Sequence, residues 1–112
     1  MALNALKEEH SDKEIICIFE PHQQSRTKLL FDDFVDSLKI ADKVFIAPIF
    51  KARETLDKTI SNEILARAVN KFIPTKAIEN ILDLSETDFG KNACVVFMGA
   101  GDIYKWVDKI IK

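Results

Sequence analysis

The sequence places a histidine and an arginine between a strand-like run and a helix-like stretch. His22 and Arg26 follow the apolar run 14–19, which Pro21 ends, and precede residues with helical spacing. An imidazole and a guanidinium beside the free backbone N–H groups of a helix N-terminus could hold a carboxylate or a phosphate. The alternative is that Ser25 caps the helix, Arg26 is solvated and His22 is an ordinary loop residue. Spacing alone favours this alternative, because isolated histidines and arginines are common.

A second candidate is the turn formed by Gly99, Ala100, Gly101 and Asp102. It opens like the fingerprint of dinucleotide-binding proteins, but Tyr104 stands where the third glycine is needed. Asp102, at the expected N-cap position, would accept the N–H groups that an anion would use. We therefore interpret the glycines as a tight turn that brings the backbone close to a neighbour at the sheet edge, and not as a nicotinamide site.

Other chemistries have less support. Cys17 and Cys94 lie inside apolar runs, which predicts buried thiols in strands and not nucleophiles. Two histidines, His10 and His22, give no ligand spacing for zinc, so we expect no metal site. The chain contains no G-x-x-x-x-G-K-[ST] phosphate loop. The charged run 51–54 is by default a solvated segment.

Composition limits the class of protein. The chain has 112 residues, 47% of them hydrophobic and 30% charged, which predicts one globular domain over residues 1–112. The net charge of -2, without a run of five or six like charges, argues against nucleic-acid binding and against a polybasic membrane patch. The apolar runs are too short to span a membrane, and no secretory signal is visible, so we expect a cytoplasmic protein.

Three β-branched, apolar runs predict buried strands at residues 14–19, 43–47 and 93–98. Apolar spacing also predicts an opening helix that includes Leu3 and a final helix over 103–111. Because parallel strands require crossover connections, usually helices, this alternation predicts an α/β sandwich with a mainly parallel sheet. Ligands of such folds bind at the carboxyl ends of the strands, which here are followed by the loops 20–25, 48–58 and 99–102.

Two internal helices are predicted from their apolar stripes and caps. The first covers Arg26 to Lys39, with Ser25 as its N-cap. The second begins after Ser61, includes Phe72 in its apolar stripe and ends before Pro74. The stretch 75–92 leaves two possibilities open: a short helix around Ile78, Ile81 and Leu82, or a short strand at Ala77 and Ile78.

Three segments together carry a family resemblance. Residues 18–28 (IFEPHQQSRTK), 50–54 (FKARE) and 98–103 (MGAGDI) resemble the C-terminal domain of bacterial Mur ligases. The family patterns F-x-P-H-x-x-[ST]-R-T, Y-x-A-R-E and G-A-G-D-I occur in the same order and on the predicted loops. The resemblance is strongest to the branch of the family that adds L-alanine to UDP-N-acetylmuramate.

The resemblance implies a Rossmann-like, three-layer third domain of a three-domain ligase of peptidoglycan synthesis. In that family ATP, with Mg²⁺, phosphorylates the carboxylate of the UDP-linked muramate, and the amino acid attacks the acyl phosphate. The third domain closes over the central ATPase domain and helps bind the amino acid and the nucleotide. By position, His22 and Arg26 would bind substrate, with Arg26 holding the carboxylate of the amino acid. Other residues would shape the same cleft: Gln23, Ser25, Gly99, Gly101 and Asp102. No catalytic residue is assigned to the chain.

The departures from the family pattern also matter. Gln23 stands where many relatives carry a second arginine, and Phe50 and Lys51 replace a usual tyrosine and a common proline. The N-terminal UDP-binding domain and the central ATPase domain are absent from this sequence, so we expect the isolated chain to be inactive and to bind neither ATP nor Mg²⁺ tightly. The alternatives are the ligase that reattaches recycled tripeptide to muramate, and a non-catalytic α/β small-molecule-binding module.

Overall fold

Strands and helices alternate along the first part of the chain, as the sequence predicts. The computed structural model describes residues 3–50, 57–80, 83–84, 89 and 92–99. The helices are α1 (Leu3–Glu9), α2 (Gln24–Leu29), α3 (Phe31–Leu38) and α4 (Asn62–Val69). The strands are β1 (Glu14–Glu20), β2 (Lys43–Ile46), β3 (Thr75–Ala77) and β4 (Ala93–Gly99).

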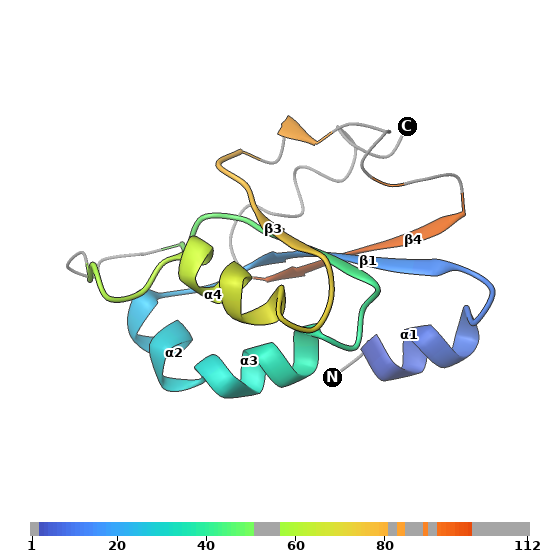
Figure 1. The fold of residues 1–112 in the computed structure, drawn as a ribbon, viewed down its shortest axis with the longest axis horizontal. Helices are drawn as coiled ribbons and strands as arrows, with labels where there is room; N and C mark the ends of the chain where they lie inside the picture. Colours follow the sequence, from blue (N-terminus) through green and yellow to red (C-terminus); the bar gives the residue numbers. More distant parts are fainter. Residues whose placement is uncertain (1–2, 51–56, 81–82, 85–88, 90–91, 100–112) are drawn as a thin grey trace.

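The strands form one parallel sheet in the order β3-β2-β1-β4. Ile18 in β1 lies opposite Phe45 in β2 and Phe97 in β4, so β1 is hydrogen-bonded on both sides. Because every pair is parallel, the carboxyl ends of the strands share one edge of the sheet (Figure 1). The predicted α/β class with a parallel sheet is confirmed, and the arrangement is consistent with a Rossmann-like three-layer sandwich.

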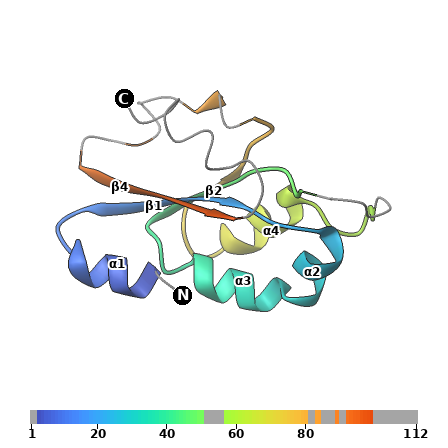
Figure 2. The same cartoon turned by 180° about the vertical axis from the view of Figure 1, so that it is seen from behind.

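Side chains of β1 alternate between two apolar clusters, one on each face of the sheet. Ile15, Cys17 and Phe19 pack with residues of α1, α3 and α4, whereas Ile16 and Ile18 pack on the opposite face with a second set. That second set comprises Phe45, Ala47, Ile78 and Phe89. Figures 1 and 2 show α1, α2 and α3 together below the sheet, so these helices cover one face. The final helix predicted over 103–111 lies outside the described residues.

The predicted helix 26–39 is wrong in detail, because it is two helices separated at Leu30. Leu30 has φ −103° and ψ 21°, outside the helical range, although its N–H still donates to the Arg26 carbonyl at 3.0 Å. The two halves are buried differently: α2 buries the polar Gln24 and Thr27, whereas α3 buries Val35 and Leu38. An apolar stripe in the sequence indicates the burial of apolar side chains, as in α3, but not the burial of polar ones, as in α2.

Two further details differ from the prediction. Ser25 is not the N-cap, since α2 begins one residue earlier, at Gln24, and is preceded by Gln23. Phe72 is not part of an apolar helix face: α4 ends at Val69 and the Phe72 side chain is 59% exposed. The centroid of the Phe72 ring instead lies 4.7 Å from the Lys39 ammonium, a cation–π contact at the surface.

The remaining predictions for this region are confirmed in part. The Ser61 hydroxyl caps α4 by accepting the Ile64 N–H at 3.2 Å, and α4 ends before Pro74. Of the two possibilities for 75–92, a short strand is present, but it runs over Thr75–Ala77 and so ends before Ile78. Ile81 and Leu82, named for the alternative helix, lie outside the described residues. Cys17 is buried in β1, as predicted, whereas the prediction of a buried thiol is wrong for Cys94, which is only partly buried because β4 is the last strand of the described sheet. None of the helices in the described ranges has both the length and the apolar character that a membrane crossing requires.

Candidate functional site

The loop that follows β1 is joined to the loop that follows β2. The Phe50 N–H donates to the Pro21 carbonyl at 2.8 Å, and the Gln23 N–H donates to the Phe50 carbonyl at 2.6 Å. Between these two bonds the His22 ring stacks on the Phe50 ring, with centroids 5.4 Å apart and planes 19° from parallel. His22 is therefore held by backbone and ring contacts at the carboxyl edge of the sheet.

Gln23 turns the chain from β1 into α2 through an uncommon backbone conformation. Its φ of 65° lies in the left-handed region, which non-glycine residues rarely adopt. The Gln23 carbonyl accepts two bonds from Thr27, one from its backbone N–H at 3.1 Å and one from its buried hydroxyl at 2.8 Å. Strained conformations persist where surrounding bonds fix them, and they concentrate at functional sites.

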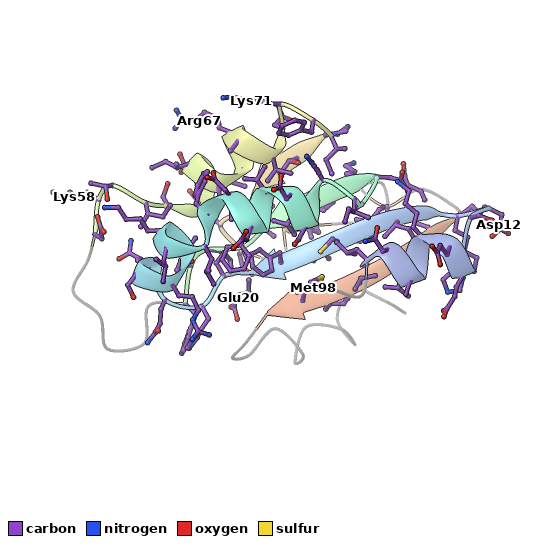
Figure 3. All side chains as sticks on the ribbon, turned by 90° about the horizontal axis from the view of Figure 1, so that it is seen from below. Asp12, Glu20, Lys58, Arg67, Lys71 and Met98 are labelled. Carbon is purple, nitrogen blue, oxygen red and sulfur yellow. The ribbon has the colours of Figure 1, made fainter. Side chains whose placement is uncertain are left out.

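Gly99, at the end of β4, lies directly beside Glu20, at the end of β1. The two residues are register partners, and a Cβ added to Gly99 would lie 2.5 Å from the Glu20 carbonyl oxygen. Gly99 also has φ +143°, where side chains are disfavoured. The predicted close approach of the glycine backbone to a neighbour is confirmed here, and the neighbour is Glu20. Figure 3 shows Glu20 and Met98 near each other on these two strands.

The buried amide of Gln24 binds the segment that leads into α4. Its Nε2 donates to the Asp57 carbonyl at 2.7 Å and to the Ile60 carbonyl at 3.1 Å, and its Oε1 accepts the Asp57 N–H at 2.8 Å. Lys28, one turn further along α2, donates to the Thr59 hydroxyl at 2.8 Å and lies 3.7 Å from the Asp57 carboxylate. The first turn of α2 and residues 57–60 therefore form one unit.

Asp57 closes a tight turn within that segment. Its Oδ1 accepts the backbone N–H of Thr59 at 2.8 Å and also the Thr59 hydroxyl. The Thr59 hydroxyl bond, followed by the Thr59 backbone bond, lowers the pKa of the Asp57 carboxyl below its ordinary value, with the Lys28 ammonium adding to the effect. Asp57 is consequently a carboxylate that orders the turn.

A groove lies along this unit at the same edge of the sheet. Its volume is about 330 Å³, and its lining includes Gln24, Ile49, Lys58 and Asn62. Asn62 holds the first turn of α4 to the strand ends, because its Nδ2 donates to the carbonyls of Ile46 at 3.0 Å and Ile78 at 3.1 Å. Lys58 and Asp12 lie at opposite ends of the molecule in Figure 3, so the groove is far from the β1 amino end.

The structure places four of the predicted site residues on one short segment. His22 and Gln23 are in the loop, and Ser25 and Arg26 are in the first turn of α2. Arg26 is exposed, and among the described residues no ion pair involves it. Gly99 is beside this segment through its contact with Glu20. Gly101, Asp102 and the run 51–54 lie outside the described residues.

Sequence reasoning missed three buried or bridging polar side chains at this edge: Gln24, Thr27 and Asn62. Each binds backbone groups: Thr27 reaches four residues back, Asn62 reaches strand ends 16 residues away, and Gln24 reaches residues 33 and 36 positions later. Thr27 carried a usable signal, since a threonine four positions after a turn residue can bond back to its carbonyl. Gln24 and Asn62 carried none, because their partners come from distant parts of the chain.

Within the described ranges, no group of three or more histidine, cysteine, aspartate or glutamate side chains is placed to hold a metal ion. The cations at this edge, Arg26 and Lys58, are instead suited to an anion. The arrangement can therefore bind a carboxylate or a phosphate at the end of β1, but the described side chains do not form a Mg²⁺ site.

Comparison with known proteins identifies relatives over nearly the whole chain. No family model matches the sequence. The chain is 42% identical over 104 residues to the UDP-N-acetylmuramate--L-alanine ligase of Levilactobacillus brevis, and 38% identical over 104 residues to that of Ligilactobacillus salivarius. Each match covers 93% of this chain but only 23% of the relative.

A relative from a third bacterium gives the same result. The ligase of this name from a Hydrogenobaculum species is 41% identical over 112 residues, which cover 96% of the chain and 24% of the relative. The chain thus spans about a quarter of the length of the curated relatives it matches. These relatives and the three loop motifs show that the chain belongs to the Mur ligase family, as a segment similar to the C-terminal domain of UDP-N-acetylmuramate--L-alanine ligases.

Proposed function

We propose that the chain is the C-terminal domain of an ATP-dependent ligase that joins L-alanine to UDP-N-acetylmuramate, and that Arg26 binds the carboxylate of the amino acid. The observation that carries the proposal is the exposed Arg26 in the first turn of α2, at the carboxyl edge of a parallel sheet, within a chain 93% covered by these relatives. The same relatives support the L-alanine-adding enzyme over the tripeptide-recycling ligase and over a non-catalytic binding module.

Arg26 has the chemistry and the position that this role needs. A guanidinium grips a carboxylate through two parallel N–H···O bonds, which an ammonium cannot do. Its neighbour Thr27 is fully buried and bound to the Gln23 carbonyl, so the turn that carries Arg26 is fixed. Lys28 is already engaged by Asp57 and Thr59, which leaves Arg26 as the cation of α2 suited to an incoming anion.

The other predicted residues would complete the wall of the site. His22, held by its stacking on Phe50, would face the substrate beside Arg26. Gln23 and Ser25 flank the turn, and Gly99 keeps the end of β4 close to Glu20. Gly101 and Asp102 are assigned to the same cleft by the family resemblance alone.

ATP and Mg²⁺ belong to the remainder of the proposed enzyme. The sequence has no phosphate loop, and the described residues offer no cluster of metal-ligating side chains. No chemical step is therefore assigned to this chain, which would help bind the nucleotide only when it closes over the central domain. The proposal accordingly includes that the chain alone has no ligase activity. It also places the enzyme in the cytoplasm, where ATP and nucleotide-linked sugars are available.

The test is steady-state kinetics of the whole ligase carrying Arg26→Ala. Because hydrogen bonds to charged groups contribute about 1.5–3 kcal/mol, we expect the KM for L-alanine to rise by roughly ten- to a hundredfold while the KM for UDP-N-acetylmuramate stays unchanged. Arg26→Lys should recover only part of the loss. Arg67→Ala is the control, since it removes an equal charge from the outer side of α4 (Figure 3). An unchanged KM for L-alanine in Arg26→Ala would remove Arg26 from the site.

A further inference from the structure

Helix α2 lacks the packing that normally fixes the direction of a helix. It has six residues, and its only buried side chains are the polar Gln24 and Thr27. Leu29, its one apolar residue, is 82% exposed. Short helices are marginal by themselves and usually depend on an apolar face for their stability. The direction of α2, and with it the direction of Arg26, must therefore depend on polar contacts.

Gln24 makes the longest-range of these contacts. It is 5% exposed, and its amide uses both ends: Nε2 donates to two carbonyls and Oε1 accepts one N–H, all from residues 57–60. An amide buried without partners would destabilise the fold, whereas one with three short bonds fixes the two segments it joins. Thr27, by contrast, binds only four residues back and so orders the turn without attaching it to another element.

The same short segment is held on its other side by Phe50. Phe50 exchanges backbone bonds with Pro21 and Gln23, and its ring stacks on His22. The chain after β2 thus contacts the β1–α2 segment twice, at Phe50 on the loop and at Asp57 on the first turn of α2. Arg26 is two residues after Gln24 and four after His22, so both contacts act on the backbone that carries it.

We propose that Gln24 is a positioning residue for Arg26: its buried amide attaches α2 to residues 57–60 and so sets the direction of the guanidinium toward the amino-acid carboxylate. This inference rests on the proposed function, because it assigns Gln24 a role only through Arg26. In this proposal Gln24 acts only through Arg26 and contacts neither the substrate nor the reacting atoms. Misplacing a binding group by about 1 Å can reduce activity by as much as a hundredfold, so a lost attachment has a measurable effect.

Gln24→Met in the whole ligase tests the inference, because methionine keeps the length of the side chain and removes its three bonds. We expect the KM for L-alanine to rise at least about fivefold with kcat within about twofold, since binding geometry and not the chemical step is affected. Gln24→Leu, which also lacks the three bonds, is the second variant should Gln24→Met fold poorly, and it should raise the KM to a similar extent.

Asp42→Ala is the matched structural control. Asp42 accepts the Ile15 N–H at 2.7 Å and pairs with Lys7 at 3.2 Å, at the opposite edge of the sheet. The Asp42→Ala substitution should lower the melting temperature as Gln24→Met does, but leave the KM for L-alanine unchanged. Equal rises of KM in both variants would show a general loss of stability and overturn the inference.

The double variant separates this inference from the proposed function. If Gln24 acts through Arg26, Gln24→Met combined with Arg26→Ala should raise KM no further than Arg26→Ala alone. A raised KM in Arg26→Ala with an unchanged KM in Gln24→Met, or fully multiplicative effects, overturns the inference and leaves the proposed function standing. An unchanged KM in Arg26→Ala overturns the proposed function, and the inference with it.

Discussion

Gly99 and Glu20 end two neighbouring parallel strands, and their backbones are so close that no side chain fits on Gly99. A Cβ there would lie 2.5 Å from the Glu20 carbonyl oxygen and 3.0 Å from the Glu20 Cβ. The contact brings the end of β4 against the strand end that leads to His22 and Arg26. A glycine in a turn motif therefore has a specific task in this fold, which is to let two strand ends meet.

The first prediction concerns this contact. Gly99→Ala should destabilise the chain by at least about 2 kcal/mol, because it adds a clash with main-chain atoms to an unfavourable φ. Urea denaturation followed by circular dichroism measures the loss. Combining it with Glu20→Gly should not restore stability, since the nearest clashing atom is the Glu20 carbonyl oxygen and not its side chain. A loss below about 0.5 kcal/mol would show that the strand ends separate easily.

At Gln23, in contrast to Gly99, we expect the backbone conformation to favour glycine over alanine. Its φ of 65° costs a side-chain-bearing residue about 1 kcal/mol or more, which glycine avoids. Gln23→Gly should therefore be more stable than Gln23→Ala by roughly 0.5–1 kcal/mol, even though glycine gains entropy on unfolding. Both variants lack the Gln23 side chain, so their difference isolates the backbone. Denaturant midpoints measured in parallel give that difference, and a less stable glycine variant would contradict the strain.

Ser61 and Ser25 provide a matched pair for the helix caps. Ser61 accepts the Ile64 N–H at the start of α4, so Ser61→Ala should cost about 1 kcal/mol. Ser25 is inside α2, where alanine is the better helix former, so Ser25→Ala should cost clearly less. Thermal unfolding of the two variants gives the comparison. Equal losses would contradict the different positions of the two serines in their helices.

Much of the fold could be predicted because its signals are local. Runs such as 14–19 and 93–98 are apolar and β-branched, and they became β1 and β4 with bounds shifted by one residue at one end. The two-helix structure of 24–38 could not be predicted, because the apolar stripe continues across Leu30 while the polar burial of Gln24 and Thr27 does not appear in it. The first half is bound through Gln24 to residues 57–60, which are far away in the sequence.

The candidate site divides in the same way. His22, Arg26 and Gly99 are candidates from their place after predicted strands and from the family resemblance, and the parallel sheet puts those strand ends on one edge. The residues that hold them were not found: Phe50 was noted only as a departure from a family pattern, and it is the ring on which His22 stacks. A residue that could bind a ligand can be recognised from its own type and position. A residue that holds it in place can be recognised only when its contact partner in the folded chain is known.

Cys17 makes stability depend on pH in the alkaline range. Burial raises the pKa of its thiol from 9.0 to about 12, so the unfolded chain loses this proton first as the pH rises. The unfolded state then binds fewer protons than the folded state, and stability falls between about pH 9 and 12, by at most about 1.4 kcal/mol per pH unit. Below about pH 9 the thiol is protonated in both states and its contribution is fully present.

Urea unfolding of the chain and of Cys17→Ala from pH 7.5 to 10.5 measures this effect. The variant should be less stable at pH 7.5, because it leaves a small cavity beside Met98, whose sulfur lies 3.5 Å from the Cys17 sulfur. Its deficit should shrink above about pH 9, since alanine has no proton to lose. Cys94→Ala is the control and should follow the steeper decline of the parent chain, because it keeps Cys17. A deficit of Cys17→Ala that stays constant to pH 10.5 would mean that the thiol ionises as readily in the fold as in the unfolded chain.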